Sequence, residues 1–565
     1  MIYNNGKKIE KKDRNHNKFS LIYKVICFLL IGIMLFQGSQ QLFKPKWFPY
    51  DDSYDAGKMR GYLNEKKDSI DILICGASHA SRGIYPMELY EKFGFKSYNL
   101  STSGQPIEAT YYLLKEAFLT QNPQVVIFDV SSLYFGNSAE YSWRYVIDDM
   151  PLGKTKIDFA KEYCEINKEE TIQELILPLM RYHTRWKELQ KQDFNYMFYD
   201  SQHHFGKGCK VSSLNNRGIT ADMANLVAEE LLLDNEKNKY TYNEGVWGEE
   251  HIAEVLYNVE IPQYNINWML KIKDLCDKNN TLLLAVKIPV TQYPQMYWSA
   301  WNMAKYHKVQ SFCNDNNIIY YDLLYDTDVD INWDTDSRDS GMHLNLYGAQ
   351  KISINIGKYL EECFNISGEY DNYWDQDLLL YQKVRKVALL ELEQNFITYI
   401  EKLRDEFQDT MIFIAASDDM SQGLNEMDFN VLQSLGLQTD FSGAIRNSYM
   451  AVIDNGQVIY EALSNRPLVY EGVRGRNEIK YRLYSAGWWT NANASIIINN
   501  REYAVNSRGI NIVVYDKKRE LVLDSVCFDT SVDFHASVRN NVMINDFEEA
   551  FEQYIMDVED KMVTF

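Results

Sequence analysis

The sequence lacks the residue spacings that hold metals, disulfide frameworks or nucleotides. Its eight cysteines are scattered over 565 residues, with no CxxC pair and no metal-like spacing. A glycine-rich loop of the nucleotide-binding kind is also missing. We therefore expect no metal site, no cofactor and no disulfide framework.

Basic residues are fewer than acidic residues in this sequence. The chain has 58 lysines and arginines against 79 aspartates and glutamates, which gives a formal net charge of -21. A nucleic-acid partner needs a basic face, so we exclude nucleic-acid binding. The length and the 46% hydrophobic content allow a large buried core and predict two or three domains.

One long apolar run is present, and it lies near the N-terminus. Residues 1–18 are polar and basic, and residues 19–37 are interpreted as a transmembrane anchor, apolar from Phe19 to Phe36 apart from Ser20 and Lys24. About 18 apolar residues are near the minimum that crosses a bilayer. The basic flank predicts a cytoplasmic N-terminus and an extracellular or periplasmic bulk. No small-x-small cleavage site follows, which favours an uncleaved anchor; a buried core helix is the alternative.

Strand and helix patterns then alternate. Continuous apolar runs predict buried strands, and apolar residues at helical spacing predict helices. The expected elements are a strand at 70–75, a helix at 86–93, a strand at 96–100, a helix at 107–119 and a strand at 125–130. This order predicts a parallel sheet with helices on its faces.

The pattern is less regular over 138–260, which we interpret as a helical insertion or lid. It resumes with a helix at 265–278, a strand at 281–286, a helix at 301–316, a strand at 318–323 and a helix ending near 360. We assign this domain to 62–366. A long helical stretch at 375–407 and strand patterns after it predict a separate α+β domain at 375–565.

Ser78 is the candidate nucleophile. It follows the apolar run 72–75 and the small residues Gly76 and Ala77, so it would stand at the carboxyl end of a strand, where open α/β sheets bind their ligands. A serine in this position is also a common helix N-cap, and that alternative stays open.

Acyl transfer needs a base beside the nucleophile and a group that orients the base. His343 is a better base than His79, because a sequence neighbour on a turn generally points away. Asp339 lies near His343 in the sequence and is the candidate acid, with Asp336 in reserve.

These residues resemble the motifs of the SGNH (GDSL-like) hydrolase superfamily, in the segments GASHA at 76–80, NLSTSGQP around Gly104, and DSGMHLNLYGA with Asp339 and His343. The resemblance covers about 65–365 and implies a flavodoxin-like three-layer α/β/α fold with a Ser-His-Asp site. Asp339 is four residues before His343 rather than three, and the usual Gly-x-Asn-Asp motif is absent. The oxyanion hole would then rest on the backbone N–H groups of Ser78 and Gly104.

The layout is similar to the membrane-anchored branch of that superfamily, which takes part in polysaccharide O-acetylation and teichoic acid D-alanylation. This similarity implies acyl transfer to a cell-surface polysaccharide beside a membrane-bound O-acyltransferase. Lys287, His183 and Arg185 are candidates for the acceptor site. The alternative is that Lys287 is solvated and that the segment RYHTRW packs a lid.

The C-terminal segments 413–436 and 507–530 resemble the two halves of the interleukin-like EMT inducer domain in reversed order, which we interpret as a circular permutation between helices at 392–407 and 547–558. This resemblance implies carbohydrate binding, with five candidate residues: Asp418, Asp419, Arg446, Arg508 and Asn511. The alternative is that the two aspartates cap a helix and Arg508 is a structural partner.

Two hypotheses follow. In the first, the chain is an exported, membrane-anchored serine acyltransferase or esterase that modifies a cell-surface polysaccharide. In the second, it is a non-catalytic surface protein that binds carbohydrate on an SGNH-like scaffold.

Overall fold

The computed structural model describes residues 6–44, 58–134, 140–168, 170–189, 193–194, 205–209, 211, 231–234, 239–242, 260–289, 297–324, 326, 328–338, 343–475, 478–532 and 535–539. The chain forms two compact units. Unit 1 comprises 1–210, 226–329 and 352–369, and unit 2 comprises 211–225, 330–351 and 370–565. Asp339, much of the expected insertion and the expected helix at 547–558 lie outside the described residues.

Unit 1 is built on a five-stranded sheet with the order β2-β1-β3-β6-β7. Every neighbouring pair of strands is parallel. This is the order of flavodoxin-like sheets, so the predicted α/β fold class is confirmed. The strands are β1 Ile72–Cys75, β2 Ser97–Asn99, β3 Val125–Asp129, β6 Leu282–Lys287 and β7 Ile319–Asp322.

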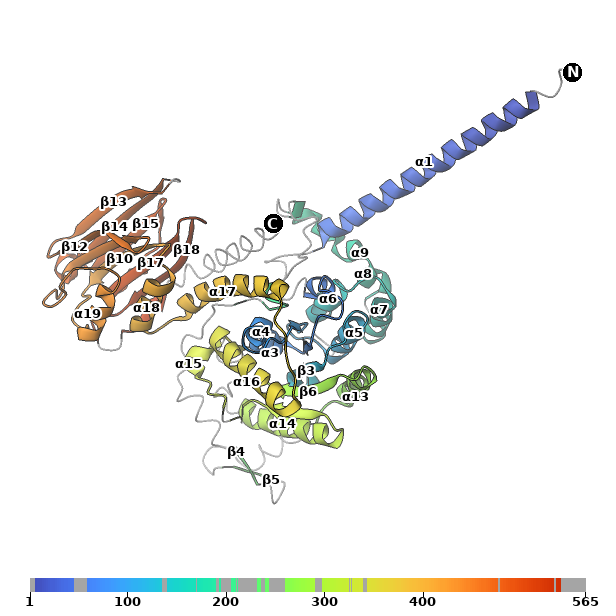
Figure 1. Cartoon of the computed structure of the whole chain (residues 1–565), viewed down its shortest axis with the longest axis horizontal. Coiled ribbons are helices and arrows are strands. Elements are labelled where there is room, and N and C mark those ends of the chain that lie inside the picture. The colour runs from blue at the N-terminus through green and yellow to red at the C-terminus, as the bar shows by residue number, and fades with distance from the viewer. Residues whose placement is uncertain are drawn as a thin grey trace. The chain divides into compact units, whose positions relative to one another are not determined.

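Helices cover both faces of this sheet (Figure 1). On one face α4 packs against α16, so closely that a Cβ added at Gly357 would lie 2.2 Å from Cε2 of Phe93. On the other face α5 packs against α13. The helices that follow the strands are α4 Pro86–Phe93, α5 Ile107–Ala117, α13 Gln263–Lys278, α14 Tyr297–Asp315 and α16 Leu346–Phe364.

The expected bounds of α4 agree with the structure because the sequence marks both ends. Pro86 occupies the first helical position, where its missing N–H costs nothing. Gly94 follows the last residue with φ of +70°, a left-handed conformation that glycine adopts without strain.

The described chain is largely helical before the sheet, between β1 and α4, and between β3 and α13. Among the described residues, one segment is long and apolar enough to cross a membrane: Leu21–Phe43, with a mean hydropathy of 2.1. It belongs to α1. The elements are α1 Gly6–Phe43, α2 Lys58–Leu63, α3 Ser78–Gly83, η1 Val130–Tyr134, α6 Glu140–Ile147, α7 Lys154–Ile166, α8 Ile172–Ile176, α9 Pro178–Tyr182, η2 His183–Lys187 and the hairpin strands β4 Leu231–Asp234 and β5 Lys239–Tyr242.

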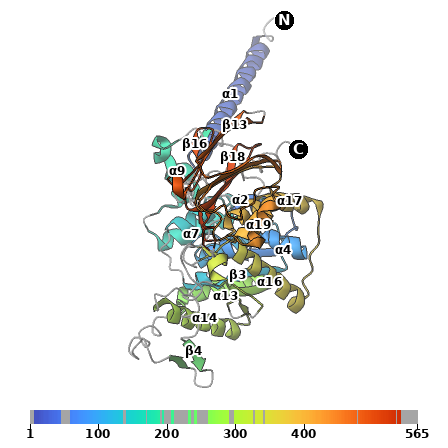
Figure 2. The same ribbon diagram turned by 90° about the vertical axis from the view of Figure 1, so that its left-hand side faces the viewer.

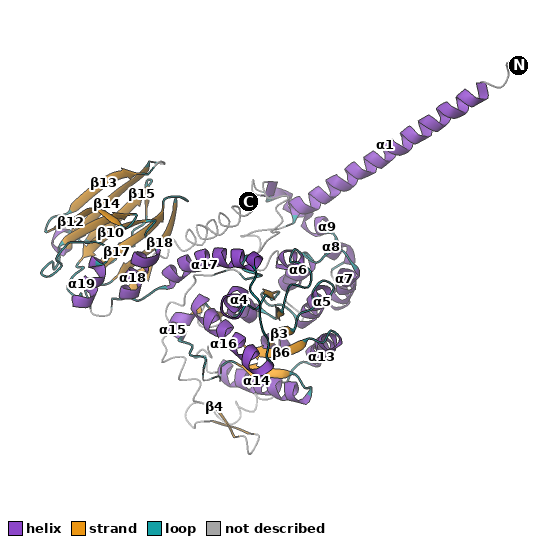
Figure 3. Ribbon diagram, viewed as in Figure 1, coloured by secondary structure: helices purple, strands orange, loops and turns teal. Residues whose placement is uncertain are grey.

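Unit 2 contains a ten-stranded sheet, drawn in orange in Figure 3. The main path is β16-β15-β14-β10-β17-β18-β19; β11 pairs with β10 and β12, and β13 pairs with β14. All pairs are antiparallel except β10 with β14. The strands are β10 Met411–Asp418, β11 Ser448–Asp454, β12 Gln457–Ser464, β13 Leu468–Arg474, β14 Ile479–Gly487, β15 Asn493–Ile498, β16 Arg501–Glu502, β17 Gly509–Asp516, β18 Leu521–Phe528 and β19 Ser537–Arg539.

The remaining elements of unit 2 are short, apart from one helix pair. They are α15 Trp333–Asp336, β8 Ser337–Arg338, β9 His343–Leu344, α17 Asn372–Leu392, α18 Phe396–Glu406, α19 Glu426–Gln433 and η4 Trp488–Thr490. The helical stretch expected at 375–407 consists of two helices, α17 and α18, because the chain turns between Leu392 and Phe396.

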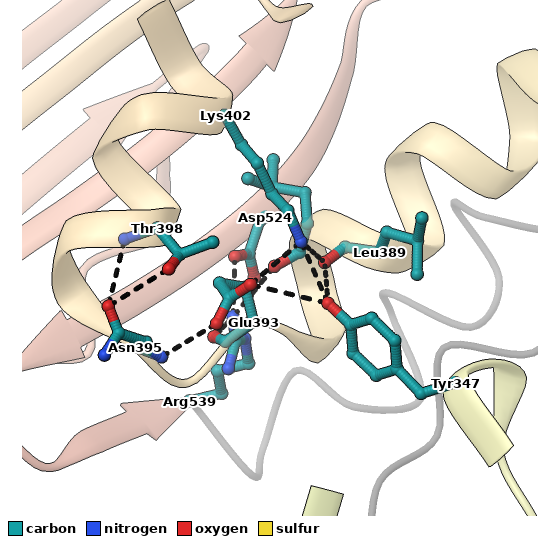
Figure 4. Close-up of polar contacts among 9 residues, drawn as sticks. Tyr347, Leu389, Glu393, Asn395, Thr398, Lys402, Asp524 and Arg539 are labelled. Carbon is teal, nitrogen blue, oxygen red and sulfur yellow. Dashed lines mark hydrogen bonds and ion pairs between the residues drawn. The ribbon is translucent and has the colours of Figure 1, made fainter. Parts of the chain in front are cut away.

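The break is held by side chains from both sides (Figure 4). Asn395 caps α18 by accepting the N–H of Thr398 at 3.0 Å. Lys402 Nζ reaches back across the turn and donates to Glu393 Oε2 at 2.9 Å. Arg539, at the end of β19, donates to the carbonyl oxygen of Glu393 at 2.9 Å, so the turn is also bound to the sheet.

Candidate functional site

Ser78 lies where the sequence predicts, at the carboxyl end of β1. It begins α3, two residues after Gly76, and is half-buried. The sheet order changes direction between β1 and its neighbour β3, because β2 lies on one side of β1 and the later strands on the other. Such a switch point is where flavodoxin-like sheets bind ligands.

Gly76 and Asp129 set the turn that presents Ser78. Gly76 has φ of +141°, and a Cβ added there would lie 2.5 Å from Cβ of Asp129, so only glycine fits. Asp129 ends β3 and is buried, and its Oδ2 accepts the N–H of Ala77 at 3.4 Å. The hydroxyl and the N–H of Ser131 also donate to this carboxylate, at 2.6 and 3.0 Å.

Two further side chains brace α3 from its other sides. Asn99 Nδ2 donates to the carbonyl oxygens of Ala80 and Ile84, each at 2.9 Å. Lys58 Nζ donates to Ser81 Oγ at 2.7 Å. The helix that begins with Ser78 is therefore held to β2, β3 and α2 within unit 1.

Sequence reasoning missed Asp129, Asn99 and Lys58 as supports of this turn. A signal was available for Asp129, a polar residue that ends the apolar run of β3, but not for Asn99, because its strand β2 reads SYN and is not apolar. Gly104, the predicted oxyanion donor, is half-buried in the loop after β2 with φ of +60°. That conformation explains why glycine occupies this position.

Lys287 ends β6 and is 2% exposed, so its side chain is buried and the alternative of a solvated lysine is wrong. Its Nζ lies 3.8 Å from Oδ2 of Asp322 at the end of β7, and 4.2 Å from the ring centre of Tyr306. Burial lowers the pKa of Lys287, and the carboxylate of Asp322 works against this shift. The pair occupies the carboxyl edge of the sheet, and a substrate role for Lys287 stays a prediction.

The predicted base lies in the other unit. His343 is half-buried in β9, which pairs with β8 so that His343 opposes Arg338. Asp336 is buried, and its Oδ2 accepts from Lys351 Nζ at 2.6 Å and from the N–H of Asn332 at 2.8 Å. Because Ser78 belongs to unit 1 and His343 to unit 2, their pairing stays a prediction.

His183 and Arg185 differ in their surroundings. His183 is exposed, and its Nδ1 lies 2.8 Å from the carbonyl oxygen of Met180. Arg185 is 6% exposed, with one guanidinium nitrogen at 2.5 Å from the carbonyl oxygen of Phe43 and another at 3.0 Å from Oδ1 of Asp193. Arg185 therefore binds the end of α1 in this structure.

A second group of candidate side chains lies at one end of the unit 2 sheet. The register places Asp418 opposite Gly487, the residue before Trp488, and Ser417 opposite Gly509, the residue after Arg508. Trp488 and Trp489 are 54% and 68% exposed. The guanidinium carbon of Arg446 lies 5.5 and 5.0 Å from their ring centres. We call Asp418, Arg446, Trp488, Trp489 and Arg508 the sheet-end cluster.

Charge and backbone conformation distinguish the sheet-end cluster. Asp418 and Arg446 have φ of +65° and +64°, which is unusual for residues other than glycine. Arg508 pairs with Asp529 at 2.6 Å. Burial raises the pKa of Asp418, while Arg508 and Arg446 act to lower it.

The other two predicted carbohydrate residues are buried and hold turns. Asp419 Oδ1 accepts the N–H groups of Ser421 and Gln422, at 3.0 and 3.2 Å. Asn511 donates to the carbonyl oxygen of Ser507 at 2.9 Å. The following helix, α19, is capped by Asn425 rather than by the two aspartates. The sequence analysis did not include the two tryptophans among the candidate carbohydrate-binding residues. The signal that could have indicated them is the Trp-Trp pair directly after β14.

No protein-family model matches the sequence. No curated protein matches it either. Among solved structures, a protein assigned as an acylhydrolase from Bacteroides fragilis is 10% identical, with a TM-score of 0.24, over 54% of this chain and 94% of its own. A GDSL-like lipase from Bacteroides thetaiotaomicron is 9% identical, with a TM-score of 0.23, over 52% and 88%. An acetyl xylan esterase from Butyrivibrio proteoclasticus is 8% identical, with a TM-score of 0.21, over 53% and 65%.

Proposed function

We propose that the chain is an exported, membrane-anchored serine acyltransferase or esterase that modifies a cell-surface polysaccharide. The observation that carries the proposal is the position of Ser78: half-buried, at the switch point of the sheet, on a turn that Asp129, Asn99 and Lys58 hold in place. The N-cap position of α3 is occupied by Ala77 and not by Ser78, which supports a role for Ser78 other than helix capping.

The proposed chemistry is acyl transfer in two steps. Ser78 Oγ attacks the carbonyl carbon of an acyl ester, and its proton passes to His343. The alcohol of the ester leaves with that proton, and an acyl-serine remains. A second hydroxyl, from water in an esterase or from a sugar in a transferase, then takes the acyl group and restores Ser78.

The supporting residues follow from the same scheme. The backbone N–H groups of Ser78 and Gly104 would stabilise the oxyanion. Asp339 would orient His343, and we prefer it to Asp336 because the carboxylate of Asp336 is already bound by Lys351 and Asn332.

The apolar segment of α1 supports the membrane anchor, and a membrane-bound O-acyltransferase remains the proposed partner.

Labelling by a serine-reactive fluorophosphonate tests the nucleophile. We expect the wild type to label at least about 10³-fold faster than Ser78→Ala, since loss of the nucleophile removes the activated hydroxyl, and His343→Ala to slow labelling by a similar factor. Ser442→Ala, an exposed serine of unit 2, is the matched control and should label like the wild type. Equal labelling of the wild type and a folded Ser78→Ala protein would refute the catalytic proposal.

A second candidate function, carbohydrate binding, is favoured by the sheet-end cluster. Exposed tryptophan rings next to charged side chains offer the flat apolar surface and the hydrogen-bonding groups that a sugar ring needs. Binding at this cluster would hold a polysaccharide for unit 1, or would be the whole function if Ser78 is not a nucleophile.

Affinity electrophoresis of the detergent-solubilised chain, in gels that contain one of a panel of cell-wall polysaccharides, tests this function. We expect at least one polymer to retard the wild type, and Trp488→Ala and Trp489→Ala each to weaken the retardation about tenfold through loss of ring stacking. Val473→Ala removes an exposed apolar side chain that pairs near the other end of β14, and it should leave the retardation unchanged. Retardation that survives both tryptophan replacements would exclude the cluster as the binding site.

A further inference from the structure

Helix α1 has two parts with different surroundings. From Leu21 to Gln37 every residue is exposed except Cys27, which is half-buried. These 17 residues would span about 25 Å, close to the hydrocarbon thickness of a bilayer. From Gly38 to Lys44 the residues are buried or half-buried, except Gln41. We call residues 38–44 the helix root.

Buried polar contacts bind the helix root into unit 1. Lys44 Nζ donates to the carbonyl oxygen of Asp148 at 3.0 Å and forms an ion pair with Asp149. Arg185 binds the carbonyl oxygen of Phe43 from the other side and is itself paired with Asp193. The root is therefore part of the folded unit and not a linker.

The elements that contact α1 expose large apolar side chains. Both α9 and η2 pack on α1, and Figures 1 and 2 show α9 beside the end of α1 that carries the root. Met180 on α9 is 50% exposed and Trp186 on η2 is 63% exposed. The Nζ of Lys187 lies 5.3 Å from the centre of a Trp186 ring. Phe194, next to Asp193, is 59% exposed.

The position of these side chains along α1 indicates what covers them. The seven residues of the root rise about 10 Å along the helix axis. The headgroup layer on each side of a bilayer is about 5–8 Å thick. An element that touches the root therefore lies at the level of the headgroups whenever residues 21–37 span the hydrocarbon. Tryptophan and lysine are the residues that favour this layer, because each combines an apolar body with a polar end.

We propose that Met180, Trp186, Lys187 and Phe194 form a membrane-docking patch that inserts into the headgroup layer of the membrane that α1 crosses. The patch seats unit 1 on the bilayer, with the apolar groups among the upper acyl chains and Lys187 at the lipid phosphates. This proposal rests on the proposed membrane anchor and is independent of the chemistry proposed for Ser78.

The test uses the full chain in lipid nanodiscs, with an environment-sensitive NBD probe on single cysteines. Cys363→Ser removes the exposed native thiol and gives the background. The probe is placed in turn by Trp186→Cys, by Leu30→Cys within the apolar segment, and by Leu270→Cys. Leu270 is an exposed apolar residue of α13, which lies away from α1 in Figures 1 and 2.

We expect NBD at position 186 to emit at a shorter wavelength than NBD at position 270. We also expect its intensity to fall when the nanodisc contains lipids that carry a doxyl quencher at a shallow position. NBD at 270 should not be quenched, and NBD at 30 should be quenched by a deep doxyl group. Quenching at 30 but not at 186 would overturn the patch alone. No quenching at either position would overturn the membrane anchor and the patch together. A shorter emission wavelength at 186 without lipid quenching would mean that protein, such as a second copy of this chain, covers the patch, and would also overturn the proposal.

Discussion

Glu108 is an acidic residue in a position that disfavours its charge. It lies in the first turn of α5 and is 1% exposed. Burial raises its pKa to about 7, and the nearby charge of Glu162 adds to this shift. Because the folded pKa exceeds the unfolded value, the folded chain binds the extra proton between about pH 4.5 and 7. Stability is therefore lost as the pH rises through this window and stays at the lower level above it.

We expect Glu108→Gln to raise the free energy of unfolding of unit 1 by about 1–3 kcal/mol at pH 8, because the amide removes the cost of a buried charge. At pH 4 the carboxyl is largely protonated in both states, so the gain should nearly vanish. Urea unfolding at the two pH values measures the difference, with Glu116→Gln on the same helix as the control. A gain of equal size at both pH values would show that titration of Glu108 is not its cause.

At the scale of elements, local sequence signals determined some boundaries and tertiary contacts determined others. The pattern at 375–407 is helical on both sides of residue 394, so periodicity alone favours one helix. The chain turns there because Asn395 caps α18, while Arg539 and Lys402 bind the turn from a distant strand and from the next helix. These partners are 146 and 9 residues from Glu393 along the chain, and a local window detects neither contact.

Strand β13 illustrates the same limit. Its three apolar residues, 468–470, are followed by Glu471 and Gly472, and every residue along the strand is half-buried or exposed. It exists because it pairs with β14 over its full length. Helix α3 has only six residues, which is too short for a helical period to be recognised.

At the scale of the whole molecule, the strongly acidic chain begins with a basic segment followed by the apolar part of α1. A basic flank is retained on the cytoplasmic side of a membrane, which places both folded units on the other side under the proposed topology. Cys363 provides a probe of this arrangement. It is the one exposed cysteine of the eight, since the others are buried or half-buried.

We expect a membrane-impermeant maleimide to label the protein on intact cells, and Cys363→Ser to lose most of that label, because an exposed thiol outside the membrane is free to react. Permeabilised cells give the total reactive thiol as the reference. If labelling of Cys363 occurs only after permeabilisation, the orientation is opposite to the proposed one.

The sequence by itself determined the α/β class, most strands and helices of unit 1 and the position of Ser78 after the first strand. These features depend on apolar runs, helical spacing and end signals such as Pro86 and Gly94, all of which are local. Tertiary structure decided which polar side chains hold the candidate site and the end of α1 in place. Asp129 holds the turn before Ser78, Lys287 is buried beside Asp322, and Arg185 binds the end of α1. It also gathered Asp418, Arg446 and two tryptophans at one end of a sheet, because strand register joins residues that lie far apart along the chain.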